Sequence, residues 1–162
     1  MNAEAAQRAP HRDKGIAGLV EGAAAALVFI GAYVPWVHTF VLFTSVSVRG
    51  VDTRYGAILP LIPLVALGLL AWRWYARRAR WAHLVVCALG VLVVVLALVY
   101  AVEVKRNLAQ AQQSIARSGQ LLPGSIRVGF DVGIYLTVTG GAAMVGGSLL
   151  GLRQESSIHK QE

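Results

Sequence analysis

The stretch Trp72–His83 (Trp-Arg-Trp-Tyr-Ala-Arg-Arg-Ala-Arg-Trp-Ala-His) separates two long apolar segments and decides the fold. Amphipathic aromatic rings favour the headgroup level of a bilayer, and short loops rich in arginine stay on its cytoplasmic side. The stretch therefore predicts the inner hairpin of a membrane protein, with an inner loop at residues 75–80. The arginines that set the topology are Arg73, Arg77, Arg78 and Arg80. The expected interfacial anchors are Trp36, Trp72, Trp74 and Trp81.

The composition agrees with a membrane protein. Of the 162 residues, 56% are hydrophobic and only 14% are charged, which is too apolar for an ordinary soluble domain. The net charge of +7 gathers beside the apolar segments, where it suits anionic lipid headgroups, and no basic face suggests nucleic acid. Cys87 is the single cysteine, so an intrachain disulfide is excluded.

The apolar segments predict an all-α membrane domain over residues 16–152, built as a four-helix bundle. The transmembrane helices are expected at about 16–34, 56–74, 81–102 and 129–152, with outer loops at 35–55 and 103–128. Residues 1–15 and 153–162 are expected to be cytoplasmic tails. The first segment is longer than the apolar part of a signal peptide and lacks a cleavage site of small residues, so a retained helix is favoured.

Four spans would place both termini on the same side of the cell membrane. The proposed inner segments carry nine lysines and arginines, against six in the outer ones. The short arginine-rich hairpin decides the orientation, because charge in short loops has the strongest effect. Both termini are therefore expected in the cytoplasm.

The outer loops carry two further signals. Residues 40–48 are rich in β-branched and aromatic residues, with a turn at 49–52, and predict a small extracellular β-like element. A lone hairpin is marginal in water, so it is expected to lie on the outer ends of the helices. The third helix continues without a breaker to Arg117 and is expected to extend past the membrane until Ser118-Gly119.

Small residues mark the helix-packing faces. In the fourth segment, Gly133, Gly140 and Gly147 repeat every seven residues, and Gly151 continues a small-xxx-small row. In lipid, close backbone approach must supply much of the contact between helices. Gly18 and Gly22 start a similar row with Ala26 in the first segment. Helices one and four are therefore expected to form a close pair.

Three acidic residues lie in or beside the spans. Glu21 has two interpretations: a proton or ion site, or a carboxylate that reaches the inner interface or pairs with a hinge arginine, which is the favoured one. Glu103 and Asp131 mark the outer ends of helices three and four. Ion pairs with nearby basic residues are expected for both. These basic residues are Lys105, Arg106 and Arg127.

No pattern for catalysis, cofactor binding or metal binding is present in the sequence. His38 and His83 are expected on opposite sides of a hydrocarbon core about 30 Å thick, and neither has a second ligand at i+3 or i+4. There is no phosphate-binding loop and no Ser-His-Asp spacing. We therefore predict no catalytic residue, no metal, no cofactor and no enzymatic activity of the chain alone.

The order of these signals resembles small prokaryotic four-helix (tetraspan) membrane proteins. The motifs are Pro35-Trp36 after the first helix, glycines at Gly50 and Gly56 in the first outer loop, and a Gly-x-x-x-Gly-x-Tyr-Leu sequence at Gly129–Leu136. The layout is also similar to that of claudin-like tetraspans. The claudin Gly-Leu-Trp motif and the two loop cysteines are missing, so no role in cell junctions is implied.

Three functions are compatible with this sequence. The leading hypothesis is an integral membrane structural or interaction protein, an accessory or assembly-forming tetraspan that binds itself or a membrane protein partner. The second is an oligomeric channel or transporter component that uses Glu21. The third is a subunit of a membrane enzyme complex whose ligands come from other chains.

Overall fold

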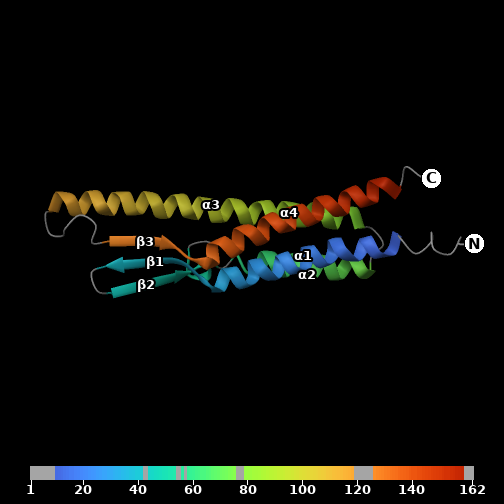
Figure 1. The fold of residues 1–162 in the computed structure, drawn as a ribbon, viewed down its shortest axis with the longest axis horizontal. Coiled ribbons are helices and arrows are strands. Elements are labelled where there is room, and N and C mark those ends of the chain that lie inside the picture. The colour runs from blue at the N-terminus through green and yellow to red at the C-terminus, as the bar shows by residue number, and fades with distance from the viewer. Residues whose placement is uncertain are drawn as a thin grey trace, which may run out of the picture.

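A computed structural model describes the backbone of residues 10–41, 44–53, 56, 58–75, 79–118 and 126–158. Side chains are described for residues 16–40, 45–53, 56, 58–72, 81–114 and 128–153. The helices are α1 (Pro10–Tyr33), α2 (Leu61–Tyr75), α3 (Ala79–Ser118) and α4 (Val132–Ile158), and the strands are β1 (Pro35–Val41), β2 (Thr44–Arg49) and β3 (Ile126–Phe130). A short 3-10 helix, η1 (Gly50–Asp52), follows β2. Figure 1 shows an elongated helix bundle with the sheet at one end.

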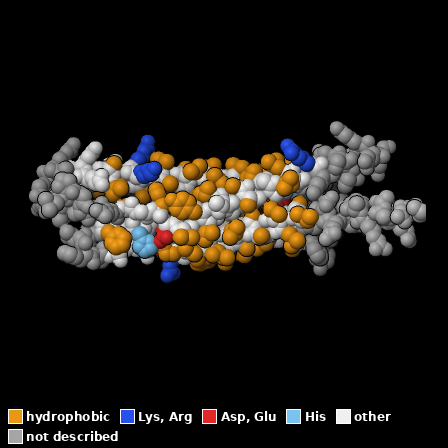
Figure 2. All heavy atoms as spheres, in the orientation of Figure 1, with side chains coloured by type: hydrophobic (Ala, Val, Ile, Leu, Met, Phe, Trp, Pro, Cys, Tyr) orange, Lys and Arg blue, Asp and Glu red, His pale blue; other side chains and the backbone are white. Residues whose placement is uncertain are grey.

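Three of the helices are long and apolar enough to cross a membrane. The candidate spans are Ile16–Tyr33, Trp81–Ser114 and Val132–Arg153, and α2 adds a shorter apolar segment, Leu61–Trp72. Hydrophobic side chains cover the middle of the surface, and the described lysines and arginines lie toward its two ends (Figure 2). This distribution is compatible with a membrane location.

The helix α3 contains 40 residues. At 1.5 Å per residue it is about 60 Å long, roughly twice the thickness of a hydrocarbon core. Its continuation to Ser118 confirms the predicted extension of the third helix. In Figure 1 this extension lies beside the three strands.

The other helix boundaries differ from the prediction. The helix α1 already begins at Pro10, and α4 continues to Ile158, so parts of both predicted tails are helical. The helix α2 starts at Leu61 and not at residue 56, because the preceding residues form turns in which the amide groups of Leu61 and Ile62 donate to the carbonyl of Ile58. With 15 residues, α2 is only about 22 Å long.

The β-like element is a three-stranded antiparallel sheet with the order β2-β1-β3. The predicted turn at 49–52 is not the turn of the hairpin. Strands β1 and β2 are joined through residues 42–43, which lie outside the described residues, and residues 50–52 form η1. Residues 126–130, expected in the outer loop and the start of the fourth helix, form β3 because they pair with β1 from Ile126 opposite Val41 to Phe130 opposite Val37.

The sheet is joined to the bundle by an apolar cluster centred on Trp36, which is only 1% exposed. Its indole N–H donates to the carbonyl of Gly31 at 2.7 Å, and its ring meets Tyr100 edge-on at 5.3 Å. The expectation that Trp36 is an interfacial anchor is therefore wrong, because β1 folds the side chain back onto α1 and α3. The other members of the cluster include Ala32, Val37, Leu59, Ala97, Ala101, Val104, Val128, Phe130 and Ile134.

The four helices pack in a closed cycle. The helix α4 packs on α1 and on α3, and α2 packs on the same two helices from the opposite side. The helices α1 and α3 therefore lie across a diagonal of the bundle. The pairing of α1 with α4 is the most extensive, as predicted for the first and fourth helices.

Glycines of α4 allow this close approach. A Cβ atom at Gly140 would lie 2.8 Å from Cγ2 of Val28 and 3.0 Å from the carbonyl oxygen of Ala24. Gly147 lies against Val20 and Glu21 of α1 in the same way. Gly133 lies against residues 34–36, which directly follow α1. The row predicted on the first helix does not take part, because added Cβ atoms at Gly18 and Gly22 would meet no atom within 4 Å.

We expect Gly140→Ala to lower the free energy of unfolding by about 1–3 kcal/mol, because the methyl group must displace packed atoms of α1. The control is Gly146→Ala in the same helix, where an added Cβ has no neighbour within 4 Å. This control should leave stability unchanged or raise it by up to about 1 kcal/mol. Equal effects of both substitutions on SDS-induced unfolding in mixed micelles would contradict this packing.

Candidate functional site

The strongest candidate site is a hydrogen-bonded pair of ionisable side chains inside the bundle, Glu21 and His83. Oε1 of Glu21 lies 2.6 Å from Nδ1 of His83. Their side chains are 0% and 1% exposed, so the prediction that Glu21 reaches the interface is wrong. Because Glu21 comes from α1 and His83 from α3, the bond crosses the diagonal of the helix cycle.

Two glycines of α4 leave the space that this pair occupies. A Cβ atom at Gly147 would lie 3.1 Å from Cγ of Glu21, and one at Gly151 would overlap the imidazole ring of His83. The glycines of the fourth helix therefore have two roles. Gly140 admits the backbone of α1, and Gly147 and Gly151 accommodate two ionisable side chains near the end of the helix. A larger residue at Gly151 would displace the imidazole.

Two buried polar atoms, one on His83 and one beside the glycines that pack on the pair, have no hydrogen-bond partner among the described residues. Ser148 lies between Gly147 and Gly151 on α4, and its Oγ is buried with no hydrogen-bond partner among the described residues. The same holds for Nε2 of His83. Buried polar atoms that lack a partner are costly, so each one requires a physical or functional explanation.

Apart from this pair, Ser148 and Thr137, the buried residues described in the bundle core are apolar or glycine. Its central cluster consists of Ala24, Ala25, Val28, Ile62, Ala66, Val86, Val93 and Met144. Removing one partner of a buried ion pair in such surroundings costs about 3–5 kcal/mol, because the other charge stays buried. Ionisable groups at membrane depth are accordingly treated as functional candidates.

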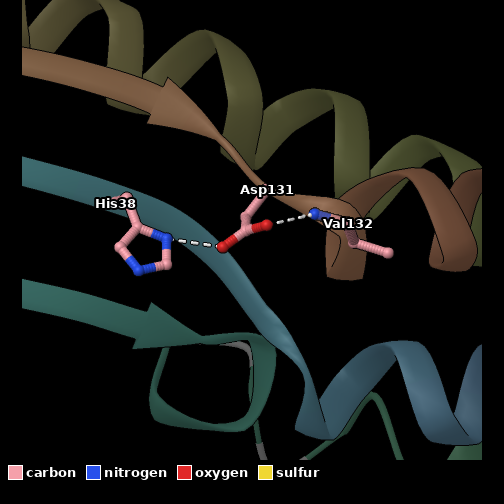
Figure 3. Close-up of polar contacts among 3 residues, drawn as sticks. All are labelled: His38, Asp131 and Val132. Atoms are coloured by element: carbon pink, nitrogen blue, oxygen red, sulfur yellow. Dashed lines mark hydrogen bonds and ion pairs between the residues drawn. The ribbon is translucent and has the colours of Figure 1, made fainter.

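A second acid–imidazole pair lies at the sheet end of the molecule (Figure 3). Nδ1 of His38 on β1 lies 2.5 Å from Oδ2 of Asp131, and Oδ1 of Asp131 accepts a hydrogen bond from the amide of Val132 at 2.7 Å. The amide of Asp131 donates to the carbonyl of Trp36 at 2.8 Å. Asp131 thus joins the sheet to the first residue of α4, where a negative charge is favourable.

The structure places the other predicted residues as follows. Asp131 pairs with His38, whereas the side chain of its expected partner Arg127 is not described. Glu103 is exposed on α3, and within the described side chains no ion pair joins it to Lys105 or Arg106.

The arginine-rich stretch is described only in part. Arg73 and Trp74 lie in the last turn of α2 and Arg80 in the first turn of α3, but their side chains are outside the description. Arg77 and Arg78 lie outside it entirely. Trp72 and Trp81 are 70% and 75% exposed, at the facing ends of the two helices.

Within the described residues, no group of three or more His, Cys, Asp and Glu side chains could hold a metal ion. No protein family model, no curated protein and no solved structure matches the chain. A role for the candidate site can therefore be inferred only from the geometry of its own residues.

Sequence reasoning named Glu21 but missed its partner. The signal was present, because Glu21 and His83 were each placed near the inner end of the predicted bundle. The two residues are 62 positions apart in the sequence. The prediction chose a hinge arginine as the partner of Glu21 and did not consider the neighbouring histidine.

We expect the Glu21–His83 pair to show a large coupling energy in a double-mutant cycle. Glu21→Gln and His83→Gln should each destabilise the protein by about 3–5 kcal/mol, and the double variant by less than the sum. The His38–Asp131 pair is the control, because its side chains are 42% and 27% exposed. Its coupling should be about 0.2–1 kcal/mol. Additive effects at Glu21 and His83 would contradict the buried pair.

Proposed function

We propose that this protein is an integral membrane interaction protein. In this proposal the helices anchor a water-exposed cap that binds a protein partner. The cap consists of the three strands and the end of α3 beside them. The bundle is proposed to span the membrane four times, with the cap outside the cell and both termini in the cytoplasm.

The arrangement of the chain supports this topology. Figure 1 shows the beginning of α1, the end of α4 and the facing ends of α2 and α3 together at one end of the bundle, and the sheet at the other. Arg73 in the last turn of α2 and Arg80 in the first turn of α3 lie at the former end. A basic hairpin on the cytoplasmic side would therefore direct the sheet to the outer side.

The observation that carries the proposal is the way the sheet is presented. One face packs on α3 through Val37, Val128 and Phe130, as members of the cluster around Trp36. Because side chains alternate along a strand, the other face carries His38 and Phe40. Phe40 is 54% exposed, although it lies on the central strand of the sheet.

An exposed aromatic residue on a braced sheet suits protein recognition. Aromatic residues are enriched in protein interfaces and often dominate the binding energy. The outer edge of β2 is unpaired within the described part of the chain, so a partner strand has a place to add. Both features lie on the cap and away from the long apolar band that suits lipid.

The test is affinity purification of the tagged full chain in mild detergent, with the native mass and co-eluting proteins measured together. A defined partner should co-elute with the wild type. Phe40→Asp should reduce its recovery at least tenfold, because a charge replaces the aromatic contact. Phe40→Leu, which keeps an apolar side chain, should retain most of it. Arg153→Gln, an exposed position of α4 at the end of the bundle away from the cap, should have no effect.

Other outcomes would replace the proposal. A strict monomer without any cross-linked partner in membranes would refute it. A symmetric oligomer without another protein would favour self-assembly or a pore. Co-elution of a haem or quinone signal would favour a subunit of a membrane enzyme complex.

A further inference from the structure

We infer that Glu21 and His83 form a proton-binding site that exchanges with only one side of the membrane, the side at the arginine-rich end of the bundle. This inference goes beyond the proposed partner binding and does not depend on it. It stands on three observations: the hydrogen bond between the two groups, the partners and surroundings of the pair, and its position along the bundle.

The hydrogen bond defines which protonation states are possible. At 2.6 Å, one proton must lie between Nδ1 of His83 and Oε1 of Glu21. With that proton on Nδ1, the carboxylate accepts the bond and Nε2 carries a lone pair. Binding of a second proton at Nε2 gives an imidazolium beside the carboxylate, and the formal charge of the two side chains changes from minus one to zero.

The surroundings make this change energetically important. Both side chains are fully buried, and a buried charge is stabilised by an opposite charge beside it. Nε2 of His83, where the second proton binds, has no hydrogen-bond partner among the described residues. The hydroxyl of Ser148, three residues before Gly151, is a buried polar group on the same helix as the glycine against which the ring packs.

The other titratable and charged groups around the pair are few among the described side chains. The described part of α2, Leu61–Trp72, carries none. On α3, Cys87 lies one turn after His83, and on α4, Arg153 is exposed two residues after Gly151. Arg73 in the last turn of α2 and Arg80 in the first turn of α3 belong to the same end of the bundle, but their side chains are not described, and residues 77 and 78 lie outside the described residues.

The position of the pair makes its access one-sided. His83 lies four residues after the start of α3, which is about 6 Å along the helix. Toward the sheet, Glu21 is followed by twelve residues of α1, about 18 Å of helix. The core in that direction is the apolar cluster described above.

No described side chain continues a proton path through that core. Thr137 is the next buried polar residue on α4, eleven residues or about 16 Å from Ser148. Its hydroxyl donates to the carbonyl of Gly133 in its own helix, at 2.9 Å. In this inference the pair binds and releases its proton at one end of the bundle, because the described side chains of the core offer no relay toward the sheet.

The first test follows protonation in the full-length protein reconstituted in lipid. Infrared difference spectra and the 15N shifts of His83 should report a change in the protonation of the pair as the pH of the sample is varied. Glu21→Gln and His83→Gln should each abolish the infrared change assigned to the pair, and His38→Gln should leave it intact. If His83 in the wild type keeps one protonation state at every pH at which the protein stays folded, the proton-binding site is refuted, even where a variant fails to fold.

The second test addresses sidedness. Proteoliposomes with a potassium gradient and valinomycin should show no proton flux above that of protein-free vesicles. A proton flux that Glu21→Gln abolishes would overturn the one-sided site and establish a relay across the membrane. Neither readout involves partner capture, so failure here is distinguishable from failure of the proposed interaction function.

Discussion

The close contact of α1 with α4 is the constraint on which the rest of the structure depends. Glycines at positions 133, 140 and 147 remove the side chains that would separate the two helices. In a membrane, where lipid provides little hydrophobic force between helices, such contact at short range would hold them together. The same approach places the first residues of β1 beside the beginning of α4, where Gly133 packs against the indole of Trp36. The bundle and the sheet are therefore built on one helix pair.

The sheet and the bundle are joined at two levels. The apolar level is the cluster around Trp36, in which residues of α1, β1, β3, α3 and α4 meet. The polar level is Asp131, which binds the carbonyl of Trp36, the imidazole of His38 and the first amide of α4. The residues that link the sheet to the bundle lie next to helix ends in the sequence. The direction of each helix therefore determines the position of the strand beside it.

Much of this architecture could be predicted from the sequence, because a long helix is indicated by the average composition of a long segment. Apolar segments and unbroken helix formers revealed the long helices, and the seven-residue glycine repeat indicated which helix packs most closely. Features set by tertiary pairing were missed. Residues 126–130 alternate Ile, Val and Phe with Arg and Gly, but only the free edge of β1 makes them a strand. Trp36 was predicted to be an interfacial anchor, but the fold places its side chain in the interior. The partner of Glu21, His83, is distant in the sequence.

The pairing of the first helix with the last has a consequence for biogenesis. Chains are synthesised from the N-terminus, so α1 is made before α4, its most extensive partner, exists. Glu21 also precedes His83 by 62 residues of synthesis. During that interval the carboxyl group of Glu21 lacks both the imidazole it binds and the glycine-rich helix against which it packs. Translation of the last glycine-rich segment is then the event that closes the bundle and completes the burial of the acid–imidazole pair.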